Sequence, residues 1–381
     1  MDFDLNKEQI MFKQMVREFA DNEIAPQAAE LDEKGEFPYE LQAKMADMGL
    51  FGLPIPEEYG GSGADIVTYA TAVEEISRVS ASLGITMAAH TSLSARPILQ
   101  FGTEEQKQKW LIPLAQGKGL GAFGLTEPEA GSDAGNTKTT AEEDGDEWVI
   151  NGTKCFITNS GTDISLLVVI TAMTGQDNGR KEITNIIVPN GAPGFTVAPK
   201  YRKMGWRSSD THELSFSDCR VPKENMLGER GEGFRSFLKS LDCGRIGVAA
   251  LSVGLAQGCL EESVKYAKDR QAFGKPIGKH QAVAFMIADM ATEIELARTA
   301  TLKAAWLCDQ GRNYTKEASI AKLFASETCM RAASTAVQVH GGYGYVEEYP
   351  VCRYFRDSKI MEIGEGTSEV QKIVISRELG L

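Results

Sequence analysis

Apolar residues at near-helical spacing dominate the first third of the chain, which is therefore predicted to be helical. Asn6 and Gln9 match a capping box, with Phe3 as the apolar staple that accompanies it. A second helix is predicted over Glu40–Met48 and ends at Gly49, because glycine adopts the left-handed closing conformation cheaply. After a glycine-rich loop, apolar residues at helical spacing predict a third helix: Val73, Ile76 and Val79.

The pattern changes near Leu120, where short apolar runs are separated by Gly, Pro, Asn and Asp. Trp148–Ile150 leads into Asn151 and Gly152 and then into Lys154–Thr158, so this stretch is predicted to be a hairpin. The Asn-Gly pair at its centre tolerates the positive φ of a tight turn. Three further strands are predicted in this middle third of the chain: Ile164–Thr171, Ile183–Val188 and Glu213–Phe216.

Helical spacing returns past Gly233 and continues to the end of the chain. Four apolar residues mark one face of the first helix in this region: Ile246, Val253, Leu260 and Ala267. Three more helices are predicted after it: Ala282–Cys308, Glu317–Val339 and Ser368–Leu379.

The order of predicted elements is therefore helices, sheet, helices. A length of 381 residues exceeds the roughly 250 to 300 at which a single hydrophobic core stops growing. We predict an α+β multidomain fold with an N-terminal α-helical domain (1–118), a central β-sheet domain (119–232) and a C-terminal α-helical bundle (233–381). Strands and helices do not alternate, and Gly228, Gly231 and Gly233 do not fit the GxGxxG spacing, which disfavours a dinucleotide-binding Rossmann domain.

Charge and composition narrow the range of partners. Forty basic and 53 acidic residues give a net charge of -13, which disfavours binding to nucleic acid or to an anionic membrane. The sequence shows neither a signal-peptide pattern nor a run of 18 apolar residues, so we expect a cytoplasmic protein without membrane insertion. The mature form of an organellar matrix protein would look the same. Seven separated cysteines without CxxC and four isolated histidines predict no disulfide framework and no metal site.

Two stretches of the middle third combine glycines, hydroxyls and charges. Within Phe123–Asp133, proline and glycine force an irregular backbone, which leaves polar groups of Leu125, Thr126 and Ser132 free to bond a heterocycle or a phosphate. The alternative is an ordinary turn-rich loop. A second stretch places Phe156 and Thr158 on the same face of a strand, where they can wall a flat ring, or simply pack.

Two further candidate sites lie in the C-terminal region. Arg270–Gly274 and Gln338–Tyr345 combine glycines with an arginine fork suited to pyrophosphate, and could act together across a subunit boundary. The alternative is that these glycines only end a helix. Near the C-terminus, Glu365 stands between two glycines just before a helix that Thr367 or Ser368 could cap. An apolar cleft would raise the pKa of its carboxyl towards that of a general base. An isolated acidic residue before a helix is the plainer interpretation.

The motifs FGLTEPEAGSD, RQAFGKPIGKHQ, QVHGGYGY and EGTSE, in this order, resemble those of the flavin-dependent acyl-CoA dehydrogenase family over nearly the whole chain. Within the family, the sequence is most similar to the short-chain, butyryl-CoA type. The resemblance implies that Glu365 is the catalytic base, which takes the α-proton of the acyl thioester while the β-hydride passes to flavin N5, giving the trans-2-enoyl-CoA. It also implies that the backbone N–H of the base and a flavin ribityl hydroxyl stabilise the developing enolate.

The same resemblance implies an FAD site, an acyl-CoA site and no metal. Sixteen residues match cofactor-binding positions: Phe123, Leu125, Thr126, Gly131, Ser132, Phe156, Ile157, Thr158, Arg270, Phe273, Gln281, Gln338, Gly341, Gly342, Thr367 and Glu369. Of these, Arg270, Phe273, Gln281, Gln338 and Gly342 match contacts made by a neighbouring subunit of a homotetramer. Four residues match substrate-binding positions: Ser132, Asp242, Arg245 and Gly366. Family members pass their electrons to an electron-transferring flavoprotein.

Two residues depart from patterns within the family. Gly244 stands where some members carry their base, so Glu365 is the remaining candidate. Gly364 stands where short- and medium-chain members usually have tyrosine. This glycine leaves open a branched or alicyclic acyl group such as cyclohexanecarboxyl-CoA, unless Tyr343 or Tyr345 fills the gap. The same motifs would also suit an acyl-CoA oxidase, an enzyme that reduces an enoyl-CoA in the reverse direction, or a non-catalytic acyl-CoA-binding protein.

Overall fold

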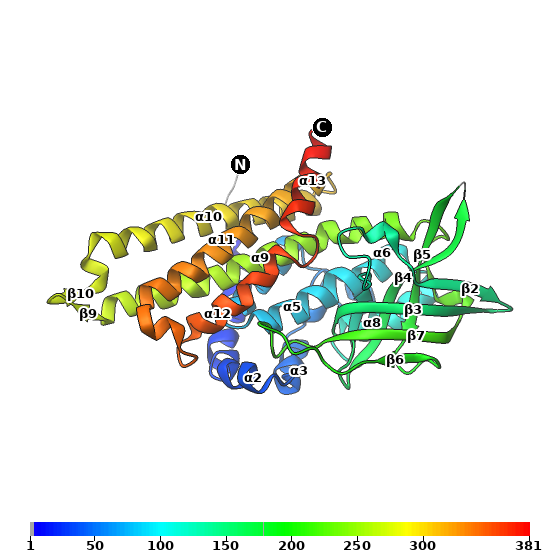
Figure 1. Ribbon diagram of the computed structural model, residues 1–381, viewed down its shortest axis with the longest axis horizontal. Helices are drawn as coiled ribbons and strands as arrows, with labels where there is room; N and C mark the ends of the chain where they lie inside the picture. The colour runs from blue at the N-terminus through cyan, green and yellow to red at the C-terminus, as the bar shows by residue number, and fades with distance from the viewer. Residues whose placement is uncertain (1–3, 178) are drawn as a thin grey trace.

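The computed structural model describes residues 4–177 and 179–381, and its order of helices, sheet and helices confirms the predicted α+β fold class. Figure 1 shows an elongated molecule in which long helices form one end and the middle, and the sheet forms the other end. The N-terminal α-helices are α1 (Lys7–Phe19), α2 (Ala28–Lys34), α3 (Tyr39–Asp47), α4 (Ile66–Val79), α5 (Ala81–Ala89), α6 (Arg96–Phe101), α7 (Glu104–Gln106) and α8 (Ile112–Ala115).

Local sequence signals set the ends of the first helices. Asn6 caps α1, and Gln9 completes the predicted capping box with bonds of 2.9 and 3.0 Å. Phe3, the predicted staple, lies outside the described residues. Gly49 follows α3 in the left-handed conformation with φ 72°, as its position predicted. These local predictions are confirmed because caps depend on neighbouring residues alone.

Strands β1 to β8 form one mixed sheet in the order β6-β7-β3-β2-β4-β5-β8, with β1 pairing in parallel with β4, and β9 and β10 form a separate two-stranded sheet. Antiparallel ladders join β3 to β2 and to β7, and β4 to β5. The strands are β1 (Leu120–Gly124), β2 (Thr140–Asp144), β3 (Glu147–Thr158), β4 (Ser165–Asp177), β5 (Arg180–Pro189), β6 (Phe195–Val197), β7 (Thr211–Pro222) and β8 (Met226–Leu227). The sequence interpretation did not identify β1, β2, β6 or β8.

The predicted hairpin at Asn151 and Gly152 is wrong. Both residues lie inside the single strand β3, and the register against β7 shifts between Ile150 and Gly152. A Cβ at Gly152 would lie 2.4 Å from Thr139 Oγ1, so the glycine permits a close approach inside the sheet. The hairpin turn lies earlier, between β2 and β3, where Gly145 has φ 60°. A glycine that relieves packing inside a strand and a glycine that makes a turn have the same sequence signature.

The C-terminal region is built on the 37-residue helix α9 (Gly233–Asp269). Its predicted apolar face is confirmed, because Ile246 and Val253 are fully buried and Leu260 packs against the same core. The remaining elements are β9 (Gln271–Ala272), β10 (Lys275–Pro276), α10 (Gln281–Asp309), α11 (Thr315–His340), α12 (Pro350–Ser358) and α13 (Ser368–Glu378). The three later predicted helices correspond to α10, α11 and α13, while α12 was not predicted.

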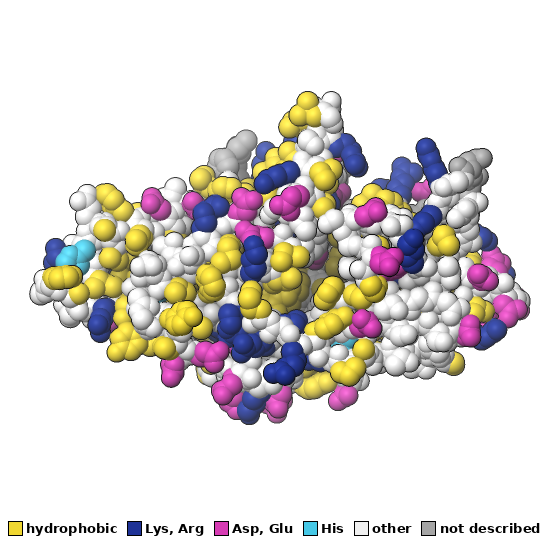
Figure 2. All heavy atoms as spheres, in the orientation of Figure 1, with side chains coloured by type: hydrophobic (Ala, Val, Ile, Leu, Met, Phe, Trp, Pro, Cys, Tyr) yellow, Lys and Arg dark blue, Asp and Glu magenta, His cyan; other side chains and the backbone are white. Residues whose placement is uncertain are grey.

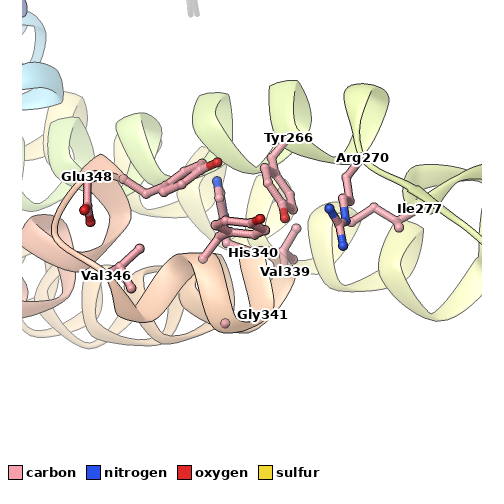
Figure 3. A pocket seen from close by; sticks show the side chains of 11 residues that line it. Tyr266, Arg270, Ile277, Val339, His340, Gly341, Val346 and Glu348 are labelled. Atoms are coloured by element: carbon pink, nitrogen blue, oxygen red, sulfur yellow. The ribbon is translucent and has the colours of Figure 1, made fainter.

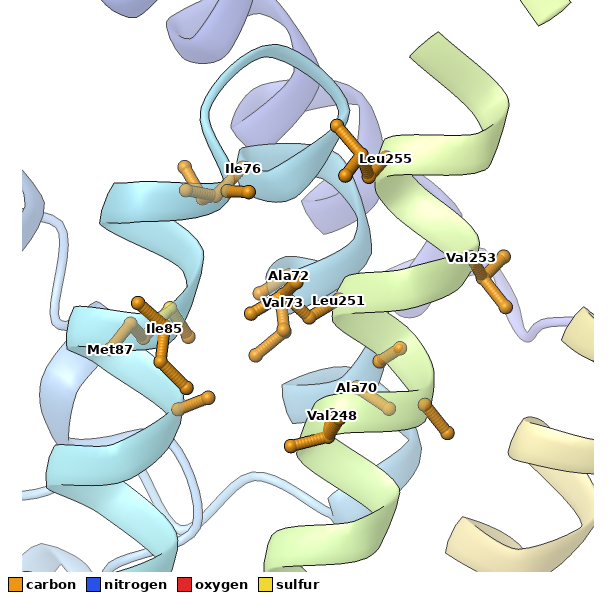
Figure 4. Packing of buried hydrophobic residues seen from close by; sticks show 14 of the residues in the cluster. Ala70, Ala72, Val73, Ile76, Ile85, Met87, Val248, Leu251, Val253 and Leu255 are labelled. Carbon is orange, nitrogen blue, oxygen red and sulfur yellow. The ribbon is translucent and has the colours of Figure 1, made fainter. Parts of the chain in front are cut away.

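The main core lies where α9 packs against the N-terminal helices α4 and α5. Figure 4 shows Val248, Leu251 and Leu255 of α9 facing the apolar side chains of α4. The helix α9 is long and apolar enough to span a membrane, but 89% of its most apolar 18-residue window is buried inside the protein. This burial is typical of the core helix of a globular protein. On the face shown in Figure 2, hydrophobic side chains gather across the middle, and acidic and basic groups are intermixed.

Candidate active site

Glu365 lies in the short loop between the 3₁₀ turn Lys359–Glu362 and α13. Its φ is 54°, and Gly366 follows with φ 92°. Thr367 then caps α13 by accepting a hydrogen bond from the N–H of Val370, which settles the choice between the two predicted caps. A positive φ is uncommon for a residue with a side chain, and such strain is found at functional sites. The loop therefore holds the Glu365 side chain in a specific direction.

The carboxylate of Glu365 is enclosed by protein. Both of its oxygens are buried, and neither has a hydrogen-bond partner among the described residues. Burial raises the pKa of Glu365 to about 7, and the positive charges of Lys322 and Arg245 oppose that rise. A carboxyl group with a pKa near neutrality is suited to remove a proton from a weak carbon acid at physiological pH.

Gly244 of α9 lies directly against this carboxylate. A Cβ at residue 244 would lie 2.0 Å from Glu365 Oε2 and 3.2 Å from Leu93 Cδ2. Real Cβ atoms do not approach other atoms so closely, so a side chain at residue 244 and the observed position of Glu365 exclude each other. Gly244 is thus part of the site, because its lack of a side chain leaves the space that the Glu365 carboxylate occupies.

Two residues that the sequence interpretation missed support the loop of Glu365. Lys322 of α11 donates to the carbonyl of Gly366 at 2.7 Å. Gln371 of α13 donates to the carbonyls of Glu365 and Gly366 at 3.2 and 2.9 Å. The signal for Lys322 was present in the sequence, because a lysine interrupts the alanine-rich face of a helix at Ala318, Ala321 and Ala325.

Two predicted substrate-binding residues lie on α9 near the base. Arg245 pairs with Asp242 at 2.6 Å, and Asp242 also accepts a hydrogen bond from Thr315 at 2.7 Å. Burial lowers the pKa of Arg245 and raises that of Asp242, against the attraction between the two charges. Arg245 Nε has no partner among the described atoms, so one donor of this buried guanidinium stays free.

The two candidate stretches of the β domain lie side by side. The N–H of Cys155 in β3 donates to the carbonyl of Thr126 at 2.7 Å, and Lys154 Nζ donates to the carbonyl of Leu125 at 3.2 Å. Lys154 and Glu127 form an ion pair at 2.6 Å with both side chains buried. Burial lowers the pKa of Lys154 to about 8. At Glu127, burial raises the pKa, but the charge and the hydrogen bond of Lys154 have the larger combined effect and the pKa falls to about 2.

Most of the predicted cofactor residues of the β domain are accessible to solvent, so they can form a surface that binds a flat ring. Phe156 is 66% exposed, has φ 61°, and stacks on Tyr201 at 5.1 Å between ring centroids. Phe123 stacks on Phe237 of α9 at 5.0 Å. Ile157 is buried, but the others are half-buried or exposed: Phe123, Leu125, Thr126, Gly131, Ser132, Phe156 and Thr158. Exposed rings beside free polar groups fit a heterocycle such as a flavin.

The predicted cofactor residues of the motifs at 270–281 and 338–342 lie at the opposite end of the molecule. Arg270 lines a pocket of about 780 Å³ together with Gly341, Gly342, Tyr266 and Tyr343. Figure 3 shows Arg270 and Tyr266 beside His340 in this pocket. The two motifs at residues 270–274 and 338–345 are thus neighbours within one chain. Three more residues of this set are exposed: Phe273 (95%), Gln281 and Gln338.

One chain alone does not bring all the predicted cofactor residues together. Figure 1 places β9 and β10 at the end of the molecule opposite the sheet, and Thr367 and Glu369 at the start of α13 between them. The highly exposed ring of Phe273, with φ 51°, projects from the β9–β10 end. The two sets of residues therefore form separate surfaces within one chain.

Among the described residues, no aromatic ring lies within 4 Å of the Cβ position of Gly364. A Cβ at Gly364 would have, among the described atoms, only the carbonyl oxygen of Ile360 within 4 Å, at 3.5 Å. The suggestion that Tyr343 or Tyr345 fills this gap is wrong. Tyr343 packs on Tyr349 at 5.3 Å in the distant pocket, and Tyr345 is 86% exposed.

Comparisons with known proteins cover the whole chain. Models described as the acyl-CoA dehydrogenase N-terminal, middle and C-terminal domains match residues 6–118, 122–219 and 231–380. The short-chain specific acyl-CoA dehydrogenase of Clostridium acetobutylicum is 50% identical, and the match covers 100% of both chains. An acryloyl-CoA reductase (NADH) of Anaerotignum propionicum is 46% identical over 100% of this chain and 96% of the relative. The butyryl-CoA dehydrogenase structure from Megasphaera elsdenii has a TM-score of 0.97 and 46% identity, with 100% of both chains covered.

Proposed function

The chain belongs to the acyl-CoA dehydrogenase family of FAD-dependent oxidoreductases, and from this premise we propose that it oxidises a short-chain acyl-CoA such as butyryl-CoA to the trans-2-enoyl-CoA. FAD, when bound, supplies the hydride acceptor at its flavin N5. The observation that carries the proposal is the buried carboxylate of Glu365, which has no hydrogen-bond partner among the described residues.

Glu365 removes the α-proton of the thioester. Its carboxylate stays available because no described donor occupies it, and its pKa of about 7 leaves a large ionised fraction at neutral pH. The side chain of Glu365 lies against Gly244, and its backbone N–H belongs to the same loop residue of positive φ. That N–H is the chain's donor for the developing enolate oxygen, and one such donor is typically worth roughly 3 to 4 kcal/mol.

The cofactor would be held by two copies of the chain. Leu125, Thr126, Ser132, Phe156 and Thr158 hold its flavin part in the β domain, where exposed polar groups and the Phe156 ring lie together. Residues at the β9–β10 end of a neighbouring subunit reach the pyrophosphate and adenosine part. The separation of the two ends supports a cofactor site shared between subunits. The homotetramer is what the resemblance to the family implies. An electron-transferring flavoprotein is the proposed electron acceptor.

Anaerobic mixing with a panel of acyl-CoAs tests this function. We expect rapid loss of the flavin's visible absorbance with butyryl-CoA. The Glu365→Gln variant should lose 10²-fold or more of the rate, since general bases typically contribute about 10²- to 10⁴-fold. Undiminished flavin reduction in Glu365→Gln would contradict the assignment of the base. Oxygen consumption during turnover would indicate an oxidase instead.

A branched or alicyclic acyl-CoA is a second candidate substrate, favoured by the lack of a side chain at Gly364, whose Cβ position has only the Ile360 carbonyl among its described neighbours, at 3.5 Å. A comparison of kcat/KM for butyryl-CoA, isobutyryl-CoA and cyclohexanecarboxyl-CoA decides between the two, and a clear preference for butyryl-CoA removes this candidate. The same site could also reduce an enoyl-CoA, the direction named for the reductase relative. Oxidation of NADH with crotonyl-CoA, coupled through an electron-transferring flavoprotein, would favour that direction.

A further inference from the structure

Lys322 is a fully buried cation that the proposed mechanism does not use. Its side chain is 0% exposed, and its ammonium group donates a hydrogen bond of 2.7 Å to the carbonyl of Gly366. Among the described residues, no carboxylate lies within ion-pair distance of it. Other buried cations are paired, as Lys154 is with Glu127 and Arg245 is with Asp242. An unpaired buried ammonium is costly, so its retention needs a reason.

The neighbours of Lys322 connect it to the base. Charged groups from several elements face Lys322. Of these groups, Glu365 has the largest effect on its pKa, followed by Arg245 of α9. Glu362 and Glu369 contribute less. Burial lowers the pKa of Lys322 to about 8, so its ammonium form still predominates at pH 7. Arg245 has its own carboxylate partner, which leaves Lys322 as the cation that mainly offsets the charge of Glu365.

We propose that Lys322 is a positioning residue for the base: its ammonium group fixes the Gly366 carbonyl, and its charge keeps the Glu365 carboxylate ionised. This inference rests on the proposed role of Glu365 as the base. Lys322 and Gln371 both donate to the Gly366 carbonyl, from α11 and α13. Two donors on one carbonyl hold a loop whose φ angles of 54° and 92° would otherwise relax.

Variants of Lys322 and Gln371 distinguish the two parts of this role, which are the tethering of the loop and the supply of a positive charge. Both tether the loop, but only Lys322 carries a charge. Losing the amide of Gln371 should slow proton removal equally at all pH values, because orientation does not depend on pH. Losing the charge of Lys322 should also raise the apparent pKa of the base, because a nearby cation favours the ionised carboxylate.

The test is the pH dependence of anaerobic flavin reduction by butyryl-CoA, from pH 6 to 9, in FAD-loaded enzyme. For Lys322→Met, the midpoint of the rate profile should rise by about one pH unit. The rate at pH 7 should then fall about five- to sixfold and recover partly towards pH 9, because a midpoint that moves from about 7 to about 8 lowers the ionised fraction at pH 7 from about one half to about one eleventh. Lys322→Arg should keep the wild-type midpoint. Gln371→Met should lower the rate without moving the midpoint.

Lys203→Met is the matched control, because Lys203 is also a lysine of low exposure with a pKa lowered by burial to about 8. Its ammonium group bonds Ser209 and Thr211 of the β domain and should leave the midpoint unchanged. A wild-type midpoint in Lys322→Met overturns the inference. If that variant does not fold or hold FAD, a shifted midpoint in Lys322→Arg overturns it instead. Full activity in Glu365→Gln would contradict the proposed base, which is a distinct failure.

Discussion

Glu365 occupies the space that a side chain at residue 244 would need: Glu365 Oε2 lies 2.0 Å from the position of a Cβ on Gly244. The two residues come from different elements, since Gly244 belongs to α9 and Glu365 to the loop before α13. A base at one position therefore requires a very small residue at the other. This relation explains in physical terms why the chain combines Glu365 with a glycine on α9.

Gly244→Ala should displace the Glu365 carboxylate and slow flavin reduction by butyryl-CoA about 10²-fold, because a misplacement near 1 Å can cost that much. Stopped-flow absorbance under anaerobic conditions measures the effect. Gly175→Ala in β4 is the control, because its Cβ would meet only the Glu182 carboxylate, at 3.4 Å or more. Equal rates in Gly244→Ala and wild type would contradict the packing relation.

The stability of the protein should depend on pH through Glu365. Its pKa is raised to about 7 in the folded protein against an ordinary 4.5, so the folded state favours the protonated form. This contribution is fully present below pH 4.5 and is lost as the pH rises through 7. Glu365→Gln, which cannot ionise, should therefore be more stable than wild type by about 3 kcal/mol at pH 8, and nearly equal at pH 4.5. Urea unfolding at the two pH values measures the difference, and an identical difference at both would speak against it.

The buried ion pair between Lys154 and Glu127 should be essential for the loop that carries Leu125 and Thr126. Lys154→Met leaves the Glu127 carboxylate buried and unpaired, which typically costs about 3 to 5 kcal/mol. We expect a large loss of stability in urea and weaker retention of FAD. Lys34→Met is the control, because the Lys34–Glu30 pair has the same 2.6 Å distance but is solvent-exposed. Exposed pairs contribute about 1 kcal/mol or less, so similar losses in both variants would count against this assignment.

Gly364 should determine tolerance for bulky acyl groups. Gly364→Tyr fills the space beside the base, where a Cβ meets nothing nearer than 3.5 Å. We expect the ratio of kcat/KM for cyclohexanecarboxyl-CoA to that for butyryl-CoA to fall at least tenfold, since small steric changes in a pocket are worth roughly 10- to 200-fold. Gly364→Ala adds only the Cβ and should keep the ratio. No change in Gly364→Tyr would show that this space does not hold the acyl group.

Features that depend on short stretches of sequence could be predicted. The capping box at Asn6, the left-handed Gly49 and the apolar face of α9 follow from residues within a few turns of one another. The same reasoning failed at Gly152. A side chain at this residue would clash with Thr139, which is distant in the sequence, and the neighbours of Gly152 in the sequence do not show this requirement. Strands β1, β2, β6 and β8 were missed because each is short and carries no clear alternation.

The sequence by itself determined the order of helices and strands, the family motifs and the candidate base Glu365 between two glycines. The tertiary structure decided what surrounds that base: Gly244 leaves it room, Lys322 and Gln371 hold its loop, and burial raises its pKa. The physical reason is that helical period and capping are local, whereas desolvation and charge depend on which distant segments pack together. A carboxylate becomes a base only through that packing.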